Sequence, residues 1–164
     1  ARKRGLNCAK QYQQNLLHKK LLIIFRERQD NSIRFIEVIF HERNYQHLTG
    51  LELTNTEGKI LQHQSKNFYR KCIENKLGLN DVDKVMGGVN FCLGLSREND
   101  VFIPSSALLE DIKKLTSSPS QVLAIFEKDI DSELYSTVKH VAKGLNLHHL
   151  ILPPEINSKI LLPK

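Results

Sequence analysis

The sequence predicts a mixed fold in which helices accompany a β-sheet, and three stretches carry this prediction. Apolar residues before residue 28 recur at spacings of three and four, the pattern of an amphipathic helix. Residues 33–40 (IRFIEVIF) are mostly β-branched or aromatic, as expected of a strand. Residues 89–96 alternate between apolar side chains and small or polar ones, which is the period of a second strand.

The length and composition indicate one globular domain. The chain has 164 residues, of which 40% are hydrophobic and 26% charged, enough for a single core. We expect a basic amphipathic helix within residues 1–30, a sheet-containing body over residues 31–156 and a tail over residues 157–164. The longest apolar run, residues 21–25, is far too short to cross a bilayer, so we expect no membrane association.

The excess of positive over negative charge lies in the N-terminal segment. Residues 1–30 hold eight bases and two acids, so they account for the whole formal net charge of +6. The other 134 residues carry 16 bases and 16 acids. The body of the domain therefore gives only weak evidence of binding to a polyanion.

The pattern in the first half predicts a helix, a strand and a second helix. We predict one helix over residues 7–28, which the polar residues 29–32 end. A central strand follows over residues 33–40, because both of its alternating faces are apolar. In the next segment, Tyr45, His47 and Thr49 share one face if the chain is extended. Ser65 then caps a helix that runs to Leu77.

The second half predicts three further strands and two further helices. After the strand at residues 89–96, a hairpin turn at Asn99 leads to a short strand over residues 101–103, which Pro104 ends. Ser105 or Ser106 caps a helix through residue 115, and residues 122–126 form a second central strand. Over residues 132–144 the helix and strand periods disagree, and we favour a helix. The tail is expected to pack as a final strand and an extended segment.

The sequence motifs give no indication of a cofactor or a metal site. There is no dinucleotide fingerprint, phosphate loop or nucleophile elbow. His148 and His149 are adjacent and would point to opposite faces of a strand, so they are poor joint metal ligands. The three cysteines, Cys8, Cys72 and Cys92, lack the CxxC spacing of a zinc site, and their odd number argues against a disulfide framework. We therefore expect no cofactor, no metal and a reducing interior such as the cytoplasm.

The remaining residue types, His, Lys, Arg, Thr and Tyr, suit metal-free cleavage of RNA. This reaction needs a base for the 2′-OH proton, an acid for the leaving oxygen, and cations or hydroxyls that stabilise charge on phosphorus. Histidine can take either proton-transfer role near neutral pH. His47 with Thr49 is the best-placed pair, at the expected end of a strand.

Several ordered motifs resemble those of the phage-associated BECR nuclease-like domains, a group named for barnase, EndoU, colicin and RelE nucleases. The motifs are NYQHLTG at 44–50, KNFYRKC at 66–72, CLGLSREND and FIPSSALLEDI within 92–112, VLAIFEK at 122–128 and VAKGLNL at 141–147. The resemblance spans about residues 8–156. It implies an α+β fold, with helices packed on a mainly antiparallel sheet, and a metal-independent ribonuclease activity.

The resemblance also implies roles for individual residues. His47 and Thr49 would lie at the catalytic site, and Tyr69, Lys71, Lys128 and Lys143 would contact phosphate or stabilise charge. The partner would be RNA, in the cytoplasm of a bacterial host, and the chain would come from a phage or mobile element.

Two other functions remain open at this point. One is a catalytically inactive binding module or phage-encoded inhibitor that holds a host protein or a nucleic acid. The basic excess favours it, because these residues lie in the first segment rather than around His47. The other is an accessory domain of a larger phage protein. The sequence predicts no particular oligomeric state.

Overall fold

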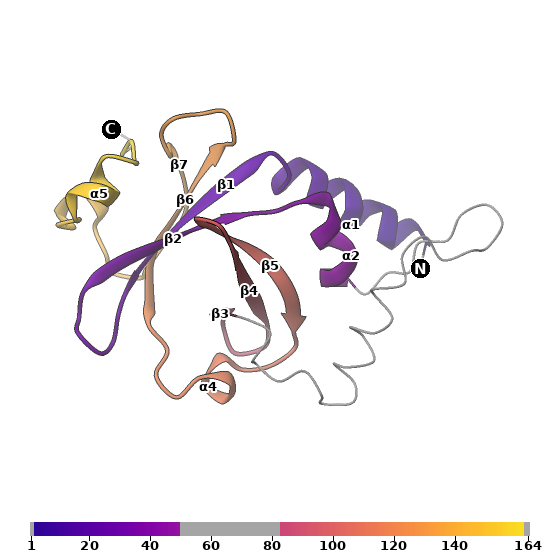
Figure 1. Ribbon diagram of the computed structural model, residues 1–164, viewed down its shortest axis with the longest axis horizontal. Coiled ribbons are helices and arrows are strands. Elements are labelled where there is room, and N and C mark those ends of the chain that lie inside the picture. Colours follow the sequence, from indigo (N-terminus) through magenta and orange to yellow (C-terminus); the bar gives the residue numbers. More distant parts are fainter. Residues whose placement is uncertain (1, 50–82, 163–164) are drawn as a thin grey trace.

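The computed structural model describes residues 2–49 and 83–162, and a seven-stranded sheet organises this part of the chain (Figure 1). The strand order is β3-β4-β5-β2-β1-β6-β7, and all pairings are antiparallel except that of β2 with β5. This mostly antiparallel sheet with a few short helices confirms the predicted α+β class. The strands are β1 (Lys19–Arg26), β2 (Ile33–Ile39), β3 (Lys84–Gly87), β4 (Cys92–Glu98), β5 (Val101–Leu108), β6 (Gln121–Asp129) and β7 (Thr137–Val141).

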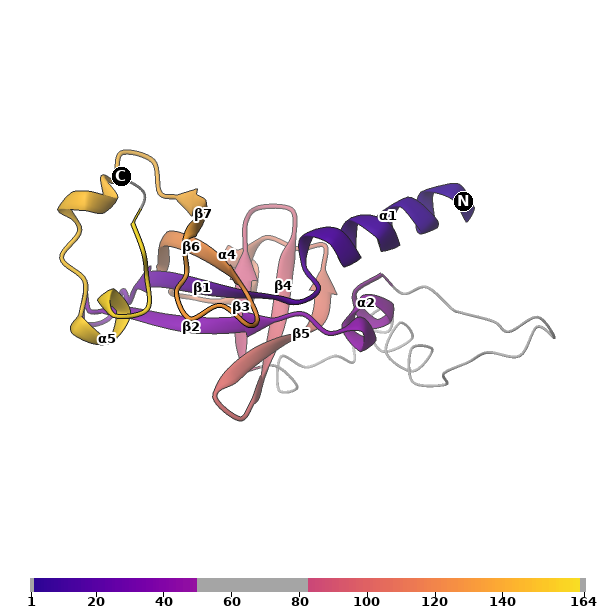
Figure 2. The ribbon, with the colours of Figure 1, turned by 90° about the horizontal axis from the view of Figure 1, so that it is seen from above.

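The helices lie around the sheet rather than in a separate layer. They are α1 (Arg2–Asn15), α2 (Glu42–Thr49), α4 (Ile112–Leu115) and α5 (Pro154–Asn157), with a 3₁₀ turn η2 (Leu147–His149). Figure 2 shows α1 and α2 at one end of the long strands β1 and β2, and α5 at the other. Tyr12 joins the first two helices, since its ring lies 5.1 Å from that of Tyr45 and its hydroxyl donates to the carbonyl of His41 at 2.9 Å. Within residues 2–49 and 83–162, no helix is long and apolar enough to span a membrane.

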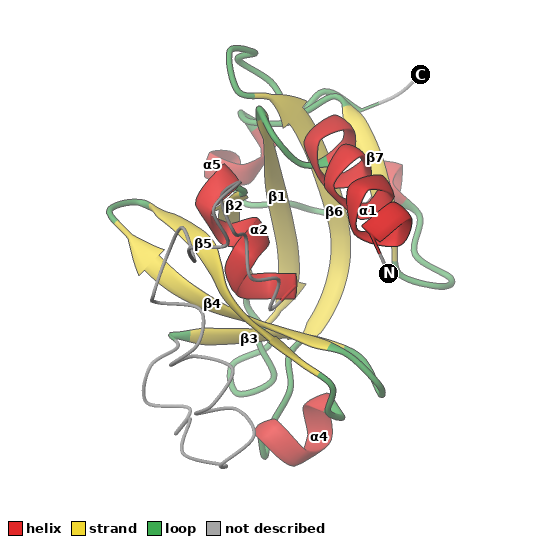
Figure 3. Cartoon of the chain, turned by 90° about the vertical axis from the view of Figure 1, so that its right-hand side faces the viewer, coloured by secondary structure: helices red, strands yellow, loops and turns green. Residues whose placement is uncertain are grey.

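The central strands are buried on both faces. On one side of β1, Leu22 and Ile24 pack with Tyr135 and Ile156, so the C-terminal segment covers this face. On the other side, Ile23 packs in a second cluster, which is closed by the helices α1 and α2 and by strands β3 to β5. Figure 3 shows β3, β4 and β5 crossing over β1, β2 and β6 because the sheet is strongly twisted. The two faces therefore have different covers, and only the second borders the cavity described below.

The helix predicted over residues 7–28 is wrong beyond Asn15. The apolar run at residues 21–25 fits the spacing of a helix face and equally fits a strand that is buried on both sides. Pairing with β2 and β6 decides for the strand. Consequently Lys19 and Lys20, assigned to a basic helix, lie in β1 and form ion pairs with Glu127 (3.0 Å) and Glu37 (3.1 Å).

The strands at residues 33–40 and 122–126 are confirmed as inner strands of the sheet, and the hairpin turn at Asn99 (φ 56°) is confirmed as well. The strand at residues 89–96 begins only at Cys92, and Phe91 lies in the preceding turn with 48% of its surface exposed. Pro104 does not end β5. It lies where the register of β4 and β5 shifts, a position at which its missing N–H is tolerated.

Three predicted elements are replaced by others. Ser105 and Ser106 cap no helix, because they belong to β5, and the short helix α4 starts instead after Asp111, whose carboxylate accepts from the Lys113 N–H. The helix favoured over residues 132–144 is wrong, because this segment contains β7, which pairs with β6. The final strand of the tail is replaced by η2 and α5, and Ile160 forms an isolated bridge to Tyr135. The helix predicted from Ser65 to Leu77 lies outside the described residues.

Candidate functional site

The segment that carries His47 and Thr49 is the helix α2, so the prediction that these two residues lie at the end of a strand is wrong. Residues two apart in a helix are rotated by about 200°, so the alternation expected of an extended chain does not hold over residues 45–49. Asn44 fixes this helix: its side chain accepts from the His41 N–H (2.7 Å) and donates to the Pro104 carbonyl (2.8 Å). The side chains of His47 and Thr49 lie outside what the structure describes.

Lys128 and Lys143, the other predicted site residues within the described part of the chain, do not lie beside α2. Lys128 donates to the carbonyls of Ser132 (2.6 Å) and Glu133 (3.1 Å), and its ammonium lies 5.0 Å from the centre of the Tyr135 ring. It thus fastens the β6–β7 connection on the face that the C-terminal segment covers, whereas Leu48 of α2 packs against the opposite face. Lys143 is exposed in the turn after β7. Tyr69 and Lys71 lie outside the described residues.

A cavity of about 390 Å³ opens on the face of the sheet that α2 also contacts. Most of its apolar lining, which we call the floor, comes from the strands β1, β2, β3 and β6, with Ile23, Phe25, Ile36, Met86 and Val122, and α4 adds Ile112 and Leu115. Its polar lining, which we call the rim, comes from the end of β1, the start of β3 and the loop after α4, with Glu27, Asp83, Lys84, Ser118 and Ser120. The cavity therefore combines an apolar base with a few polar groups, which is the usual composition of a ligand site.

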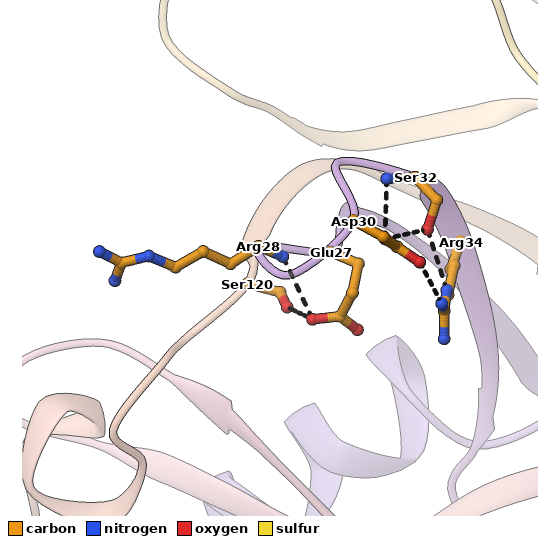
Figure 4. A network of polar contacts seen from close by, with 6 residues as sticks. All are labelled: Glu27, Arg28, Asp30, Ser32, Arg34 and Ser120. Atoms are coloured by element: carbon orange, nitrogen blue, oxygen red, sulfur yellow. Dashed lines mark hydrogen bonds and ion pairs between the residues drawn. The ribbon is translucent and has the colours of Figure 1, made fainter.

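Glu27 is the most defined polar group on this rim. One carboxylate oxygen, Oε1, accepts from the Ser120 hydroxyl (2.6 Å) and from the Arg28 N–H (3.2 Å), as Figure 4 shows. The other oxygen, Oε2, has no hydrogen-bond donor among the described residues. The carboxylate is thus held in one orientation with an acceptor left over.

The turn beside Glu27 is itself stabilised by polar contacts. The Asp30 carboxylate accepts from the Ser32 hydroxyl (2.6 Å) and N–H (3.0 Å) and from the Arg34 guanidinium (2.6 Å), also drawn in Figure 4. These hydrogen bonds, of which that from the Ser32 hydroxyl contributes most, lower the pKa of Asp30 to about 2. The Glu27 N–H donates to the Ser32 carbonyl at 2.8 Å, which links the turn to the cavity rim.

The lining also carries one cation and one further acid. The Lys84 ammonium lies 5.8 Å from the centre of the Phe25 ring and 6.0 Å from that of Phe102. Asp83 accepts from the Arg97 N–H at 2.6 Å. The described lining therefore has two carboxylates and one ammonium, a net charge of −1. Such groups can accept N–H donors from a ligand and can hold a phosphate at the Lys84 side.

The sequence patterns did not single out Glu27, Lys84 or Ser120. Glu27 was assigned to a helix, where it would have been one more exposed charge, and Lys84 follows no recognisable motif. The usable signal was the run at residues 21–25, which places Glu27 at the end of a buried strand, together with the polar loop at residues 116–120.

A second polar cluster lies under the C-terminal segment and is structural. The Glu37 carboxylate accepts from Tyr135 (2.8 Å) and lies within 3.1 Å of Lys20 and 3.4 Å of Lys159. Burial alone would raise the pKa of Glu37, but the hydrogen bonds from Tyr135 and Lys20 and the nearby positive charges outweigh it and lower the pKa. Tyr135 is only 1% exposed and the Glu37 side chain 12% exposed, so the carboxylate is mostly shielded from a substrate. Across residues 2–49 and 83–162, no three His, Cys, Asp or Glu side chains form a group that could hold a metal ion.

Comparison with known families identifies a family whose model covers the first half of the chain. The model of the family PBECR4, described as phage-Barnase-EndoU-ColicinE5/D-RelE like nuclease4, matches residues 6–88, half of the chain. The matched residues include Glu27, His47, Thr49 and Lys84 and end before Lys128 and Lys143. No curated protein and no solved structure matches the chain.

Proposed function

Because this chain belongs to the PBECR4 family of phage nuclease-like domains, we propose that it cleaves RNA by a metal-independent attack of the 2′-oxygen on the adjacent phosphate. The family match is the observation that carries the proposal. The proposed setting is the cytoplasm of a bacterial host, with RNA as the partner.

In the proposed reaction, His47 transfers protons as a general base or a general acid. A base removes the proton from the 2′-OH, and the 2′-oxygen forms a bond to phosphorus while the bond to the 5′-oxygen breaks. An acid returns a proton to that leaving oxygen, so the products are a 2′,3′-cyclic phosphate and a free 5′-hydroxyl. Thr49 and the cationic side chains would stabilise the negative charge that develops on the phosphoryl oxygens. Tyr69 and Lys71 are proposed phosphate contacts inside the matched region, and Lys128 and Lys143 are less favoured because they lie outside it.

The position of α2 supports this reading. Leu48 packs into the same apolar cluster as Ile23 and Ile36, whose side chains line the cavity floor. The helix that carries His47 and the cavity thus share one face of the sheet, and Asn44 holds this helix against β5. An RNA strand on that face would reach both.

The proposal is tested with purified protein, mixed RNA and EDTA. We expect fragments that end in a cyclic phosphate, and we expect His47→Ala to slow cleavage by about 10²- to 10⁴-fold, the usual contribution of a positioned acid or base. His149→Ala is the matched control, because His149 is exposed in η2 at the other end of the chain. Intact RNA at high protein concentration, or equal rates for the native chain and His47→Ala, would contradict the proposal.

A second candidate is a catalytically inactive binding module that uses its basic N-terminal segment. Exposed Lys10 on α1 supports it. Lys19 and Lys20 argue against it, since both are held by glutamates of the sheet. The two readings therefore place the nucleic acid on different surfaces, α1 in one case and the cavity face in the other.

A further inference from the structure

We infer that the cavity beside β3 holds one unpaired nucleobase and selects guanine through the Glu27 carboxylate. The inference rests on the proposed ribonuclease function, and it names the part of the RNA that this cavity takes.

The size and the floor of the cavity suit a single flat ring. Its volume of about 390 Å³ is near the lower end of the range for small-molecule sites, about 300–1,000 Å³. The floor formed by Ile23, Ile36 and Val122 offers apolar surface on which a base can pack, with the Phe25 side chain beside them. Proteins that recognise RNA by sequence bind unstacked bases in this way and read their edges by hydrogen bonds.

The charge of the lining favours a base over a phosphate. Two carboxylates and one ammonium leave the described lining with a net charge of −1, which repels a phosphodiester placed on the floor. A neutral base meets no such repulsion. The phosphate attached to it is better placed at the Lys84 side of the rim, where the ammonium lies near the rings of Phe25 and Phe102.

The hydrogen-bonding capacity of Glu27 then selects the base. An ionised carboxylate only accepts hydrogen bonds, so its partner must present N–H donors. Ser120 and the Arg28 N–H both donate to Oε1, which leaves Oε2 for the ligand. Guanine presents a ring N–H next to an amino group, two adjacent donors. Adenine and cytosine present one amino group beside an acceptor nitrogen, and uracil presents one N–H between two carbonyl oxygens.

The test measures binding of the four nucleoside 5′-monophosphates to the full chain by calorimetry. The four ligands share the phosphate and differ in the base. We expect guanosine monophosphate to bind about 5- to 150-fold more tightly than uridine monophosphate, the range for one paired base contact. Lys84→Gln should weaken all four ligands by similar factors, because a phosphate contact carries no information about the base.

The decisive variant is Glu27→Gln. The Arg28 N–H can donate only to the amide oxygen, so the amide NH₂ group would face the cavity and present a donor in place of an acceptor. The preference should then move from guanine toward bases that present an acceptor, such as cytosine and uracil, a change that a merely structural role of Glu27 would not produce. Glu133→Gln is the control, since Glu133 is exposed and does not line the cavity.

Each remaining outcome overturns the inference. One is equal affinity for the four mononucleotides. Another is no binding by a protein whose cooperative unfolding shows that it is folded. The third is an equal loss of affinity for all four ligands in Glu27→Gln. Mononucleotides contain no internucleotide bond, so their binding is independent of cleavage. Selective binding without RNA cleavage would refute the ribonuclease proposal and keep the base site, whereas cleavage without selective binding would do the reverse.

Discussion

At the scale of single residues, two glutamates show how the environment separates a structural group from a candidate site group. Every partner of Glu37 is a neighbouring side chain under the C-terminal segment, and its charge is balanced by Lys20 and Lys159. Glu27 lines the cavity and is held through Oε1, while Oε2 has no hydrogen-bond donor among the described residues. A carboxylate that is oriented but not fully used can bind a ligand without first breaking an internal contact.

The turn after Glu27 gives a prediction for a single titration. The pKa of Asp30 is about 2 in the folded chain, below its ordinary value of 3.8, so folding favours the ionised form. Its contribution to stability is therefore complete above about pH 4 and is lost as the pH falls through 2. We expect Ser32→Ala to raise this pKa toward the ordinary value, because the hydrogen bond from the Ser32 side chain contributes most to the lowered pKa. Ser136→Ala should leave it unchanged.

The measurement is an NMR titration of the Asp30 carboxyl carbon. An Asp30 midpoint near 4 in the native chain would show that the turn does not hold its carboxylate in this way. The result matters for the cavity because the Glu27 N–H is bonded to Ser32.

At the scale of elements, the local sequence pattern correctly predicted those strands for which it excluded a helix. β2 and β6 are short, rich in β-branched and aromatic residues, and apolar on both faces, which only an inner strand explains. β1 and β7 were taken for helices because their apolar residues also fit a helix period. Their strand form is decided by partners distant in sequence: β2 and β6 for β1, and β6 for β7.

The candidate site was less predictable than the fold for the same reason. Motif resemblance pointed to His47 and Thr49, and those assignments stay predictions. Glu27 is oriented at the cavity by a hydrogen bond from Ser120, which lies 93 residues later in the loop before β6. The sequence spacing of the two residues does not predict that contact.

The turn between β3 and β4 gives a prediction with an internal control. A Cβ on Gly87 would collide with the Phe91 carbonyl oxygen and would lie 2.6 Å from the Cys92 Cα, and both are backbone atoms that cannot rotate away. A Cβ on Gly88 would meet nothing within 4 Å. We expect Gly87→Ala to lower the free energy of unfolding by about 1–3 kcal/mol, the cost of overpacking, and Gly88→Ala to change it little. Urea unfolding measures both.

Because Gly87 also lines the cavity, Gly87→Ala should weaken mononucleotide binding as well. Equal stability of the two variants would mean that β3 does not approach Cys92 as closely as the structure places it.

At the scale of the whole molecule, the two faces of the sheet differ in what covers them. One face is closed by the C-terminal segment through Tyr135, Ile156 and Ile160. The other combines α2, the cavity and the short helix α4. The net charge of +6 does not mark the second face, because the excess basic residues belong to the first 30 residues and two of them are paired in β1.

The surface that RNA follows is therefore a prediction about the whole molecule. Lys113 is exposed on α4, directly after the cavity residue Ile112, whereas Lys10 is exposed on α1. If a single strand enters the cavity past α4, Lys113→Gln should reduce the slope of log affinity against log salt by about 0.7, the value for one phosphate contact. Lys10→Gln should leave the slope unchanged.

The measurement is fluorescence anisotropy of a labelled single-stranded RNA at 50 to 200 mM salt. Every protein in the comparison also carries His47→Ala, so that the RNA stays intact. The opposite pattern would place RNA on α1, because only a lysine that contacts phosphate changes the slope, and it would support the binding module.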